Sequence, residues 1–376
     1  MTHETRGRYT LNEIGTQGDS WRGGLRAAEA VPEGALTMLA EAGRGGMLLM
    51  GCGSTYYLAQ ALAPWVTQVL GVAAWAVPSS ELALGDGWTL ATGHRPLVVA
   101  LSRSGATSET AMAVRLAKER GCRVAVVTCY PDSELAALAD VTVALPEGQE
   151  RSFAQTRSFA GMLVATQMLV ARMGSSAACS QTEGAGCVAL GEELARLPSL
   201  AGEAVAAADA LAQRWADAGW DRVSYLGSGM RYGLAGEAMI KMKEMALATA
   251  EAFHAMEFRH GPMALVDERH LVVALLSEAM GRYEEGVLAD LCERGARVVA
   301  LGPQQPVYAD AYAAWLPVGC DLPELARSVL YLPFLQLLAY YRAMAAGQDP
   351  DRPRNVVMAI RLTGTAMETR SEEGDA

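Results

Sequence analysis

The sequence has 376 residues, a formal net charge of −11 at pH 7 and a hydrophobic content of 51%. This acidic balance argues against nucleic acid or an anionic membrane surface as the main partner, but it is compatible with a local basic pocket for a small anion. Seven cysteines without a CxxC pair do not form a disulfide framework, and we find neither a signal peptide nor an uncharged apolar run of about 18 residues. We therefore expect a cytoplasmic α/β protein without a membrane partner.

The first half of the chain alternates short apolar runs with longer helical patterns. A helical pattern over Leu25–Ala42 comes first, and a strongly apolar helix over Ser158–Arg172 closes this half. The runs between them are rich in Val and Leu, which is typical of buried parallel strands joined by helices. The predicted strands are Met47–Met50, Pro96–Leu101, Arg123–Thr128 and Val141–Leu145.

The second half shows the same alternation. Residues 175–187 are small and polar and are predicted to form a loop, and a helical pattern follows over Gly191–Ala218. The strands predicted after this helix are Val223–Leu226, His270–Leu276, Arg297–Leu301 and Ala314–Val318.

The two halves resemble each other in sequence. Three pairs of segments match in the same order at offsets of 176 or 174 residues, which indicates an internal duplication. The pairs are MLLMGCGSTYYLAQA (47–61) with VSYLGSGMRYGLAGE (223–237), LVVALSRSG (97–105) with LVVALLSEA (271–279), and RVAVVTC (123–129) with RVVALGP (297–303).

From this repeat we predict an α/β fold with two tandem, doubly wound subdomains. Each is expected to contain a parallel five-stranded sheet flanked by helices. The predicted organisation is an N-terminal helical segment (1–44), a first subdomain (45–175), a linker and helix (176–218), a second subdomain (219–346) and a C-terminal tail (347–376).

The glycine turns do not match the common nucleotide-binding patterns. A dinucleotide fold requires G-x-G-x-x-G, but Tyr56 and Tyr232 stand at the third glycine position of the two copies. The sequence G-x-x-x-x-G-K-[ST] of ATPases is absent as well. A nucleotide cofactor is therefore not expected.

A hydroxyl-rich turn over residues 102–108, with the sequence SRSGATS, follows the second predicted strand. Amides and hydroxyls at a helix start suit a phosphate monoester, because the unpaired N–H groups and the positive end of the helix dipole face the anion. The alternative is that these hydroxyls only cap the helix, each contributing about 1 kcal/mol. Four hydroxyls and Arg103 together favour a small phosphate ester.

The motifs G-x-G-[ST]-[ST]-Y and S-x-S-G-x-T and the repeated subdomain resemble the sugar isomerase (SIS) domain. Residues 237–268, with the stretch EFRHGP, and the tail 347–357 are similar to the isomerase half of glucosamine-6-phosphate synthase. The synthase's glutaminase domain and its initial nucleophilic cysteine have no counterpart in this sequence, in which Thr2 follows Met1. Glutamine-dependent amidotransfer is therefore not expected.

The resemblance implies roles for individual residues. Glu244 corresponds to the base that moves a proton between C1 and C2, and Lys241 accompanies it as a catalytic candidate. His260 corresponds to the histidine that opens the sugar ring, which relatives take from the neighbouring subunit, so a homodimer is expected. The substrate-binding residues implied are Ser54, Thr55, Ser102, Arg103, Ser104, Thr107, Phe153 and Val357.

These assignments have alternatives in the residues themselves. Glu244 could be a solvated helical residue paired with Lys241 at i−3, and His260 an ordinary turn histidine, with His254 a lesser candidate for acid–base work. His3, His94 and His270 lack acidic or thiol neighbours at ligand spacing, so no metal site is proposed.

One position departs from the synthase pattern. Met358 stands where the synthase has a lysine that forms a Schiff base, and Arg361 stays charged and is no substitute nucleophile. Three functions therefore stay open: an amino-sugar 6-phosphate deaminase or ketose/aldose isomerase, a deglycase of fructosamine 6-phosphates, and a non-catalytic sugar-phosphate sensor. The presence of both Glu244 and His260 argues against the sensor, since a sensor needs only the phosphate turn.

Overall fold

The computed structural model describes residues 6–85, 90, 93–176, 181–319 and 321–362. The chain forms two compact units. One, here called the β1–β5 unit, comprises Asp19–Ala195 and Asn355–Ala376. The other, the β6–β10 unit, comprises Met1–Gly18 and Arg196–Arg354.

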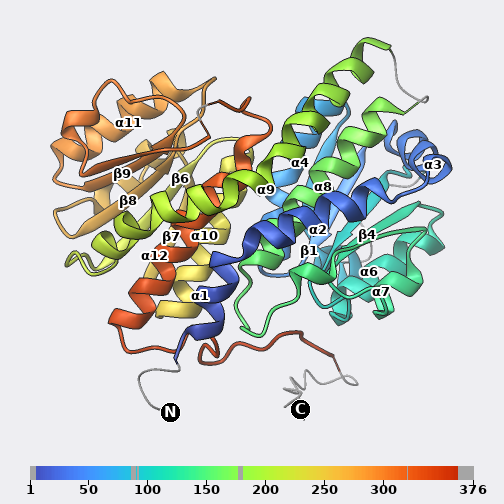
Figure 1. The fold of residues 1–376 in the computed structure, drawn as a ribbon, viewed down its shortest axis with the longest axis horizontal. Helices are drawn as coiled ribbons and strands as arrows, with labels where there is room; N and C mark the ends of the chain where they lie inside the picture. Colours follow the sequence, from blue (N-terminus) through green and yellow to red (C-terminus); the bar gives the residue numbers. More distant parts are fainter. Residues whose placement is uncertain (1–5, 86–89, 91–92, 177–180, 320, 363–376) are drawn as a thin grey trace. The chain divides into compact units, whose positions relative to one another are not determined.

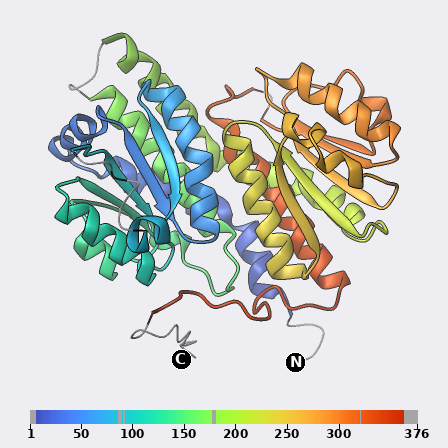
Figure 2. The same cartoon turned by 180° about the vertical axis from the view of Figure 1, so that it is seen from behind.

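The β1–β5 unit is a parallel sheet between helices (Figures 1 and 2). Its strand order is β2-β1-β3-β4-β5. Leu48, Val98 and Val124 of three central strands share one core cluster with residues of the helices α5, α6 and α7. The strands are β1 (Met47–Gly51), β2 (Ala74–Pro78), β3 (Leu97–Leu101), β4 (Val124–Thr128) and β5 (Val141–Ala144), and the helices are α2 (Gln17–Glu29), α3 (Glu33–Gly43), α4 (Ser54–Leu70), α5 (Ser79–Leu84), α6 (Ser108–Glu119), α7 (Glu134–Leu138) and α8 (Arg157–Ser175).

The β6–β10 unit repeats this topology, with the strand order β10-β9-β8-β6-β7. All its neighbouring strands are parallel as well. The strands are β6 (Arg222–Gly227), β7 (Thr249–His254), β8 (His270–Leu275), β9 (Arg297–Gly302) and β10 (Ala314–Pro317), and the helices are α1 (Arg8–Gly15), α10 (Met230–Ala246), α11 (Gly281–Glu293) and α12 (Leu332–Ala345), while α9 (Gln181–Ala216) carries the chain from one unit into the other.

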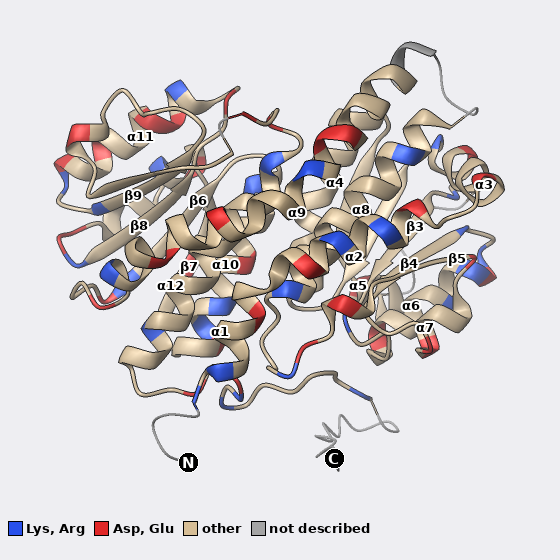
Figure 3. Ribbon diagram, viewed as in Figure 1, with Lys and Arg blue, Asp and Glu red and all other residues tan. Residues whose placement is uncertain are grey.

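The prediction of two parallel five-stranded sheets flanked by helices is confirmed, including the shared topology. The two strands that the sequence did not reveal, β2 and β7, occupy the same edge position in their sheets. Both are partly exposed, so neither needs the continuous Val/Leu run that identifies a buried strand. Charged residues lie mainly on helices and loops (Figure 3), and the strands carry only Arg222, Glu251 and Arg297.

One local prediction is wrong. Residues 175–187 were expected to be a loop, but α9 already begins at Gln181; residues 177–180 lie outside the described part. The Ala, Gln and Glu residues of this stretch are compatible with a helix, and its small polar composition is not specific for a loop. The predicted helical pattern over Leu25–Ala42 is confirmed and falls on two helices, α2 and α3, because Pro32 takes an extended conformation directly before α3.

Both glycines of each G-x-G turn are required for steric or conformational reasons. A Cβ on Gly51 would lie 2.5 Å from the carbonyl carbon of Thr55, and a Cβ on Gly227 would lie 2.5 Å from that of Arg231. The second glycine has φ 56° and ψ −126° at Gly53 and φ 57° and ψ −129° at Gly229, which L side chains rarely adopt. The first glycine lets the helix start close to its strand, and the second one turns the chain.

A buried carboxylate from the segment after α12 closes the start of α1. Asp351 accepts hydrogen bonds from the backbone N–H groups of Tyr9 (3.1 Å) and Thr10 (2.7 Å) and from the Thr10 hydroxyl (2.8 Å). The residue before the helix is Gly7, which has no side chain to cap it. Asp351 therefore supplies the cap from a distant part of the sequence.

We predict that Asp351→Ala destabilises α1 by roughly 2–3 kcal/mol, because one buried acceptor serves three donors. Hydrogen-exchange mass spectrometry of residues 8–15 should show faster exchange in the variant. Asp349→Ala is a comparison variant: Asp349 accepts the N–H groups of Gly7 and Asp351 and none from within α1, so its replacement should have a smaller effect on α1. Equal protection in Asp351→Ala and wild type would contradict the assignment.

Candidate active site

The hydroxyl-rich turn lies between the carboxyl end of β3 and the start of α6. The Ser102 hydroxyl oxygen accepts the N–H of Gly105 (3.1 Å), and that of Ser104 accepts the N–H of Ala106 (3.2 Å). Both hydroxyls therefore shape the loop as acceptors; Ser102 is buried, and Ser104 lines the cavity beside the turn. Thr107 stands at the helix start, but its side chain makes no capping hydrogen bond.

Gly105 is required for the compactness of this turn. It has φ 64°, and a Cβ there would lie 2.0 Å from the Ser133 hydroxyl oxygen. The turn is thus folded tightly against the start of α7.

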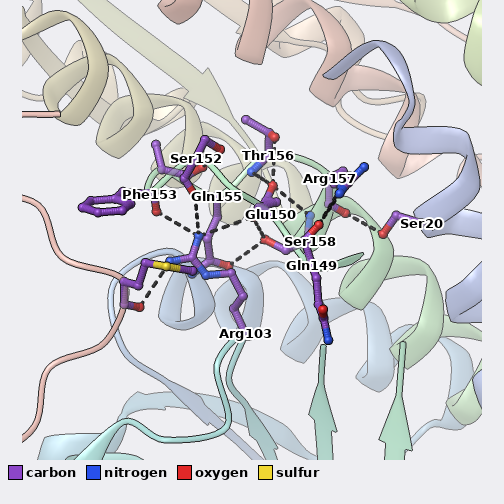
Figure 4. Close-up of polar contacts among 12 residues, drawn as sticks. Ser20, Arg103, Gln149, Glu150, Ser152, Phe153, Gln155, Thr156, Arg157 and Ser158 are labelled. Atoms are coloured by element: carbon purple, nitrogen blue, oxygen red, sulfur yellow. Dashed lines mark hydrogen bonds and ion pairs between the residues drawn. The ribbon is translucent and has the colours of Figure 1, made fainter. Parts of the chain in front are cut away.

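The Arg103 guanidinium is held by the protein itself (Figure 4). It donates to the carbonyl oxygens of Phe153 (2.8 Å) and Ser152 (3.4 Å), and its other terminal nitrogen donates to that of Met358 (3.2 Å). It also forms a buried ion pair with Glu150 at 3.4 Å, in which the side chains are 3% and 0% exposed. The structure thus brings Arg103 together with Phe153 and with the tail beside Val357, but through their backbones.

Glu150 is the site residue that the sequence did not reveal. Its carboxylate accepts the Thr156 N–H (2.6 Å) and hydroxyl (2.9 Å) and the Ser158 N–H (3.2 Å) and hydroxyl, all beside the start of α8 (Figure 4). The available signal was a lone acid shortly before a Thr and a Ser at a helix start, a pattern typical of capping. Its pairing with Arg103 was not apparent, because 47 residues separate them.

The C-terminal tail runs along the start of α6. The Ile360 carbonyl accepts the Ser108 N–H (3.2 Å), and the Leu362 N–H donates to the Ser108 hydroxyl (3.0 Å). A cavity of about 490 Å³ opens beside this contact, with Ser104, Ser108 and Arg361 in its wall. The hydroxyl-rich turn is therefore bordered by both the tail and a cavity.

Ser54 and Thr55 begin α4 and are both buried. The Thr55 hydroxyl donates to the Cys52 carbonyl (2.9 Å) and accepts the Cys52 N–H (2.9 Å). Its hydrogen is thus already used within the G-x-G turn, so Thr55 has a structural contact of its own.

In the β6–β10 unit, the structure brings Lys241 and Glu244 together in the last two turns of α10. Lys241 is buried between two carboxylates: it forms an ion pair with Glu244, and its ammonium lies 3.7 Å from Glu237. The Glu237 side chain is 2% exposed and that of Glu244 is 21% exposed. Of the two carboxylates beside Lys241, Glu244 is therefore the one that a solute can reach.

The position of Glu244 is unusual for a carboxylate. The negative end of the helix dipole lies at the C-terminus of α10, and this disfavours a carboxylate in the last turn. Lys241 offsets this cost with a neighbouring positive charge. A side chain that contradicts the local preference and is supported by a buried partner is a good candidate for a functional group.

His260 lies on a different loop of the same unit, directly after the short helix Met256–Arg259, and is exposed. The structure records no contact between its imidazole and Glu244 among the described residues. His254 stacks on Tyr232 with ring centroids 3.8 Å apart, and burial lowers its pKa, opposed in part by the Glu257 carboxylate.

His270 belongs to the core. Burial, assisted by the positive charge of Arg222, lowers its pKa to about 4, so the imidazole is neutral at pH 7. It lies 2.9 Å from the Ser224 hydroxyl, and its other nitrogen accepts from Arg222 at 3.4 Å.

Within the described ranges, no group of three His, Cys, Asp or Glu side chains has the arrangement of a metal site. None of the helices in those ranges has both the length and the apolar character needed to cross a membrane.

Comparison with known sequences identifies relatives over much of the chain. The chain is 30% identical over 320 residues to the isomerizing glutamine–fructose-6-phosphate aminotransferase of Pseudomonas putida and 31% identical over 324 residues to that of Pyrobaculum aerophilum. Each match covers 84% of this chain and 51% of the relative, so the chain spans about half the length of these relatives.

Solved structures give the same result. A glucosamine-6-phosphate deaminase from Thermotoga maritima aligns with a TM-score of 0.76 and 25% identity, covering 93% of this chain and 99% of that one. The tagatose-6-phosphate ketose/aldose isomerase of Escherichia coli aligns with a TM-score of 0.76 and 26% identity, covering 95% of this chain and 98% of that one.

The SIS domain family matches residues 38–172 and 218–308, which is more than half of the sequence. The chain therefore belongs to the SIS domain family, whose relatives here are sugar-phosphate isomerases and deaminases.

Proposed function

We propose that the chain moves a proton between C1 and C2 of a sugar 6-phosphate, and that it acts as an amino-sugar 6-phosphate deaminase. The observation that carries this proposal is the Lys241–Glu244 pair, in which one carboxylate oxygen is held by a buried ammonium while the group stays accessible. Such a carboxylate can accept a proton from a carbon acid and return it. The similarity to a deaminase and to a ketose/aldose isomerase supports the same reaction class.

The proposed reaction begins with ring opening of an aldosamine 6-phosphate by His260, which gives a free C1 aldehyde. Glu244 then removes the C2 proton, which the aldehyde acidifies, and forms an enolamine. The Glu244 carboxyl exchanges its proton with solvent and then protonates C1, which leaves an imine at C2, and addition of water releases ammonia and the ketose 6-phosphate. Every step is acid–base chemistry or hydration, so the proposal requires no cofactor.

Met358 is compatible with this direction of the reaction. The synthase-like reaction uses a lysine to form an imine with the ketose, which methionine cannot do. An aldosamine already carries the nitrogen that becomes the C2 imine, so the protein need not supply an amine. The deglycase reaction stays the alternative that product analysis distinguishes, since it releases an amino acid.

In this proposal the phosphate is bound by the hydroxyls of Ser102, Ser104 and Thr107 and by the N-terminus of α6. Arg103 is assigned a positioning role, because its guanidinium already contacts Glu150 and backbone carbonyls. Ser54, Thr55, Phe153 and Val357 are proposed to line the sugar, Thr55 through the turn that it stabilises.

Replacing both Ser102 and Ser104 by Ala should weaken binding of fructose 6-phosphate at least about tenfold, because two hydrogen bonds to an anion are lost. Isothermal titration calorimetry measures this directly. Ser175→Ala is a control outside the turn, since its hydroxyl donates to the Arg172 carbonyl at the end of α8. An unchanged dissociation constant in the double variant would show that the turn only shapes the loop.

Glu244→Gln should reduce turnover about 10²–10⁴-fold, since the amide keeps the shape but loses the proton-transfer step. In D2O, the wild type should place deuterium at C1 of the ketose product, and the variant should not. Glu237→Gln changes the other carboxylate beside Lys241, which is buried, and should retain deuterium incorporation. Full exchange in Glu244→Gln would assign the base to another residue, and His254 would be examined first.

We further propose a homodimer in which His260 serves the site of the partner subunit. The exposure of His260 and the open surroundings of Gly261, at φ 123°, are compatible with an interface loop. Mixing Glu244→Gln with His260→Ala chains tests this proposal. Hybrid dimers would contain one intact site, so about a quarter of the wild-type activity should return after random exchange. A mixture that stays inactive after verified subunit exchange would place His260 in the site of its own chain.

A further inference from the structure

The second subdomain contains a counterpart of the phosphate turn. Because β8 repeats β3, residues 276–281 correspond to 102–107, and the equivalent backbone hydrogen bonds are Ser102 N–H to Val127 O and Leu276 N–H to Leu301 O. The turn after β6 repeats the one after β1, with Gly229 and Gly53 in nearly the same conformation. The β6–β10 sheet therefore has the same helix starts at its switch point, between β6 and β8.

Carboxylates of the chain accept hydrogen bonds from the polar groups of this second turn. Glu284 accepts the N–H (2.8 Å) and the hydroxyl (3.0 Å) of Ser277. Glu324 accepts the N–H of Glu278 at 3.1 Å, and Glu278 corresponds to Ser104 of the first copy. A carboxylate of the chain thus lies where the first copy presents a hydroxyl turn to an anion.

Two buried arginines form ion pairs with the carboxylates of Glu324 and Glu278. Arg231 stands where the first copy has Thr55 and pairs with Glu324 at 2.7 Å, and Arg327 pairs with Glu278. The two arginines are only 8% and 2% exposed. Within the described part of the chain, the Nε atoms of both and one terminal nitrogen of Arg327 have no hydrogen-bond acceptor.

These guanidinium N–H groups are donors that the Glu324 and Glu278 carboxylates leave unused, although one oxygen of Glu284 also lacks a donor within the described residues. A buried donor without an acceptor is costly, and phosphate offers more acceptor oxygens than a carboxylate does. A cavity of about 520 Å³ borders Ser277 and Glu278, so a small anion has access to this region.

We propose that the carboxylate of Glu324 is an internal ligand that fills the anion site of the second subdomain. Its Oε1 atom stands in for one phosphate oxygen, since this single oxygen accepts from both the Glu278 N–H and the Arg231 guanidinium. Glu278, Glu284 and Glu324 outnumber Arg231 and Arg327, and this excess of negative charge excludes a phosphate dianion. Removing Glu324 leaves a donor set that accepts inorganic phosphate.

The test titrates the full chain with inorganic phosphate at constant ionic strength, in the Ser102→Ala/Ser104→Ala background, so that the second site is measured alone. Adding Glu324→Ala should tighten phosphate binding at least about tenfold, with one new site per chain. Phosphate should also raise the unfolding midpoint of this variant more than that of its parent. Adding Arg231→Gln to Glu324→Ala should abolish the gain.

Circular dichroism first establishes that each variant is folded, and Glu324→Gln, which keeps the side-chain volume, replaces the Ala variant if that one is not. No gain of binding in a folded Glu324 variant would overturn the proposal, as would a gain that persists without Arg231. Two phosphates bound per chain of the wild type would also overturn it. The proposed role of the first turn is judged separately, from the wild type against the Ser102→Ala/Ser104→Ala parent.

Discussion

The buried ion pair between Arg103 and Glu150 is the interaction on which the candidate phosphate site depends. It joins the turn after β3 to the segment before α8, and the Arg103 guanidinium also reaches the tail, 255 residues further along the chain. Removing one member of a buried pair leaves an uncompensated charge and commonly costs about 3–5 kcal/mol. Glu150 also accepts four donors from Thr156 and Ser158, so its carboxylate is well satisfied, whereas the buried Nε of Arg103 has no acceptor within the described residues. The shape of the hydroxyl turn is therefore determined by distant parts of the sequence rather than by the turn alone.

This arrangement also determines how the turn can bind an anion. The charge of Arg103 is matched by Glu150, so no free cation is left at the turn from this pair. Affinity for a phosphate would then come from hydroxyl and amide donors, from the helix dipole and from Arg361 in the wall of the adjoining cavity. The hydroxyl and amide donors are fixed in direction, whereas a flexible cation attracts any anion. A neutral, rigid turn thus favours recognition of a phosphate monoester by its geometry, and it is consistent with the acidic composition of the whole chain.

The sequence was sufficient for features that are local or repeated. Buried strands such as β3 and β8 carry continuous Val and Leu residues, and the common offset between the halves identified the duplicated fold. The edge strands β2 and β7 escaped prediction, because partial exposure removes that signal. In the site, the hydroxyl turn was predicted because its residues are consecutive. Glu150 and the contacts of Arg103 were not, because their partners meet only in the folded chain.

Because the fold is duplicated, both turns present the same backbone N–H groups, and the two copies satisfy these groups with different side chains. The glycine turns give both copies nearly the same backbone, so each copy presents N–H groups of a helix start at its switch point. Such groups need an acceptor when they are buried, whether or not a ligand is bound there. The first copy shapes its turn with hydroxyls, which can accept from the loop and still donate to a ligand. The second copy uses Glu284 and Glu324, which accept but cannot donate when ionised, and it adds Arg231 to balance the charge. In the proposed assignment, the helix start of the second copy is satisfied by the chain's own carboxylates, and the identity of two or three side chains separates a binding turn from a closed one.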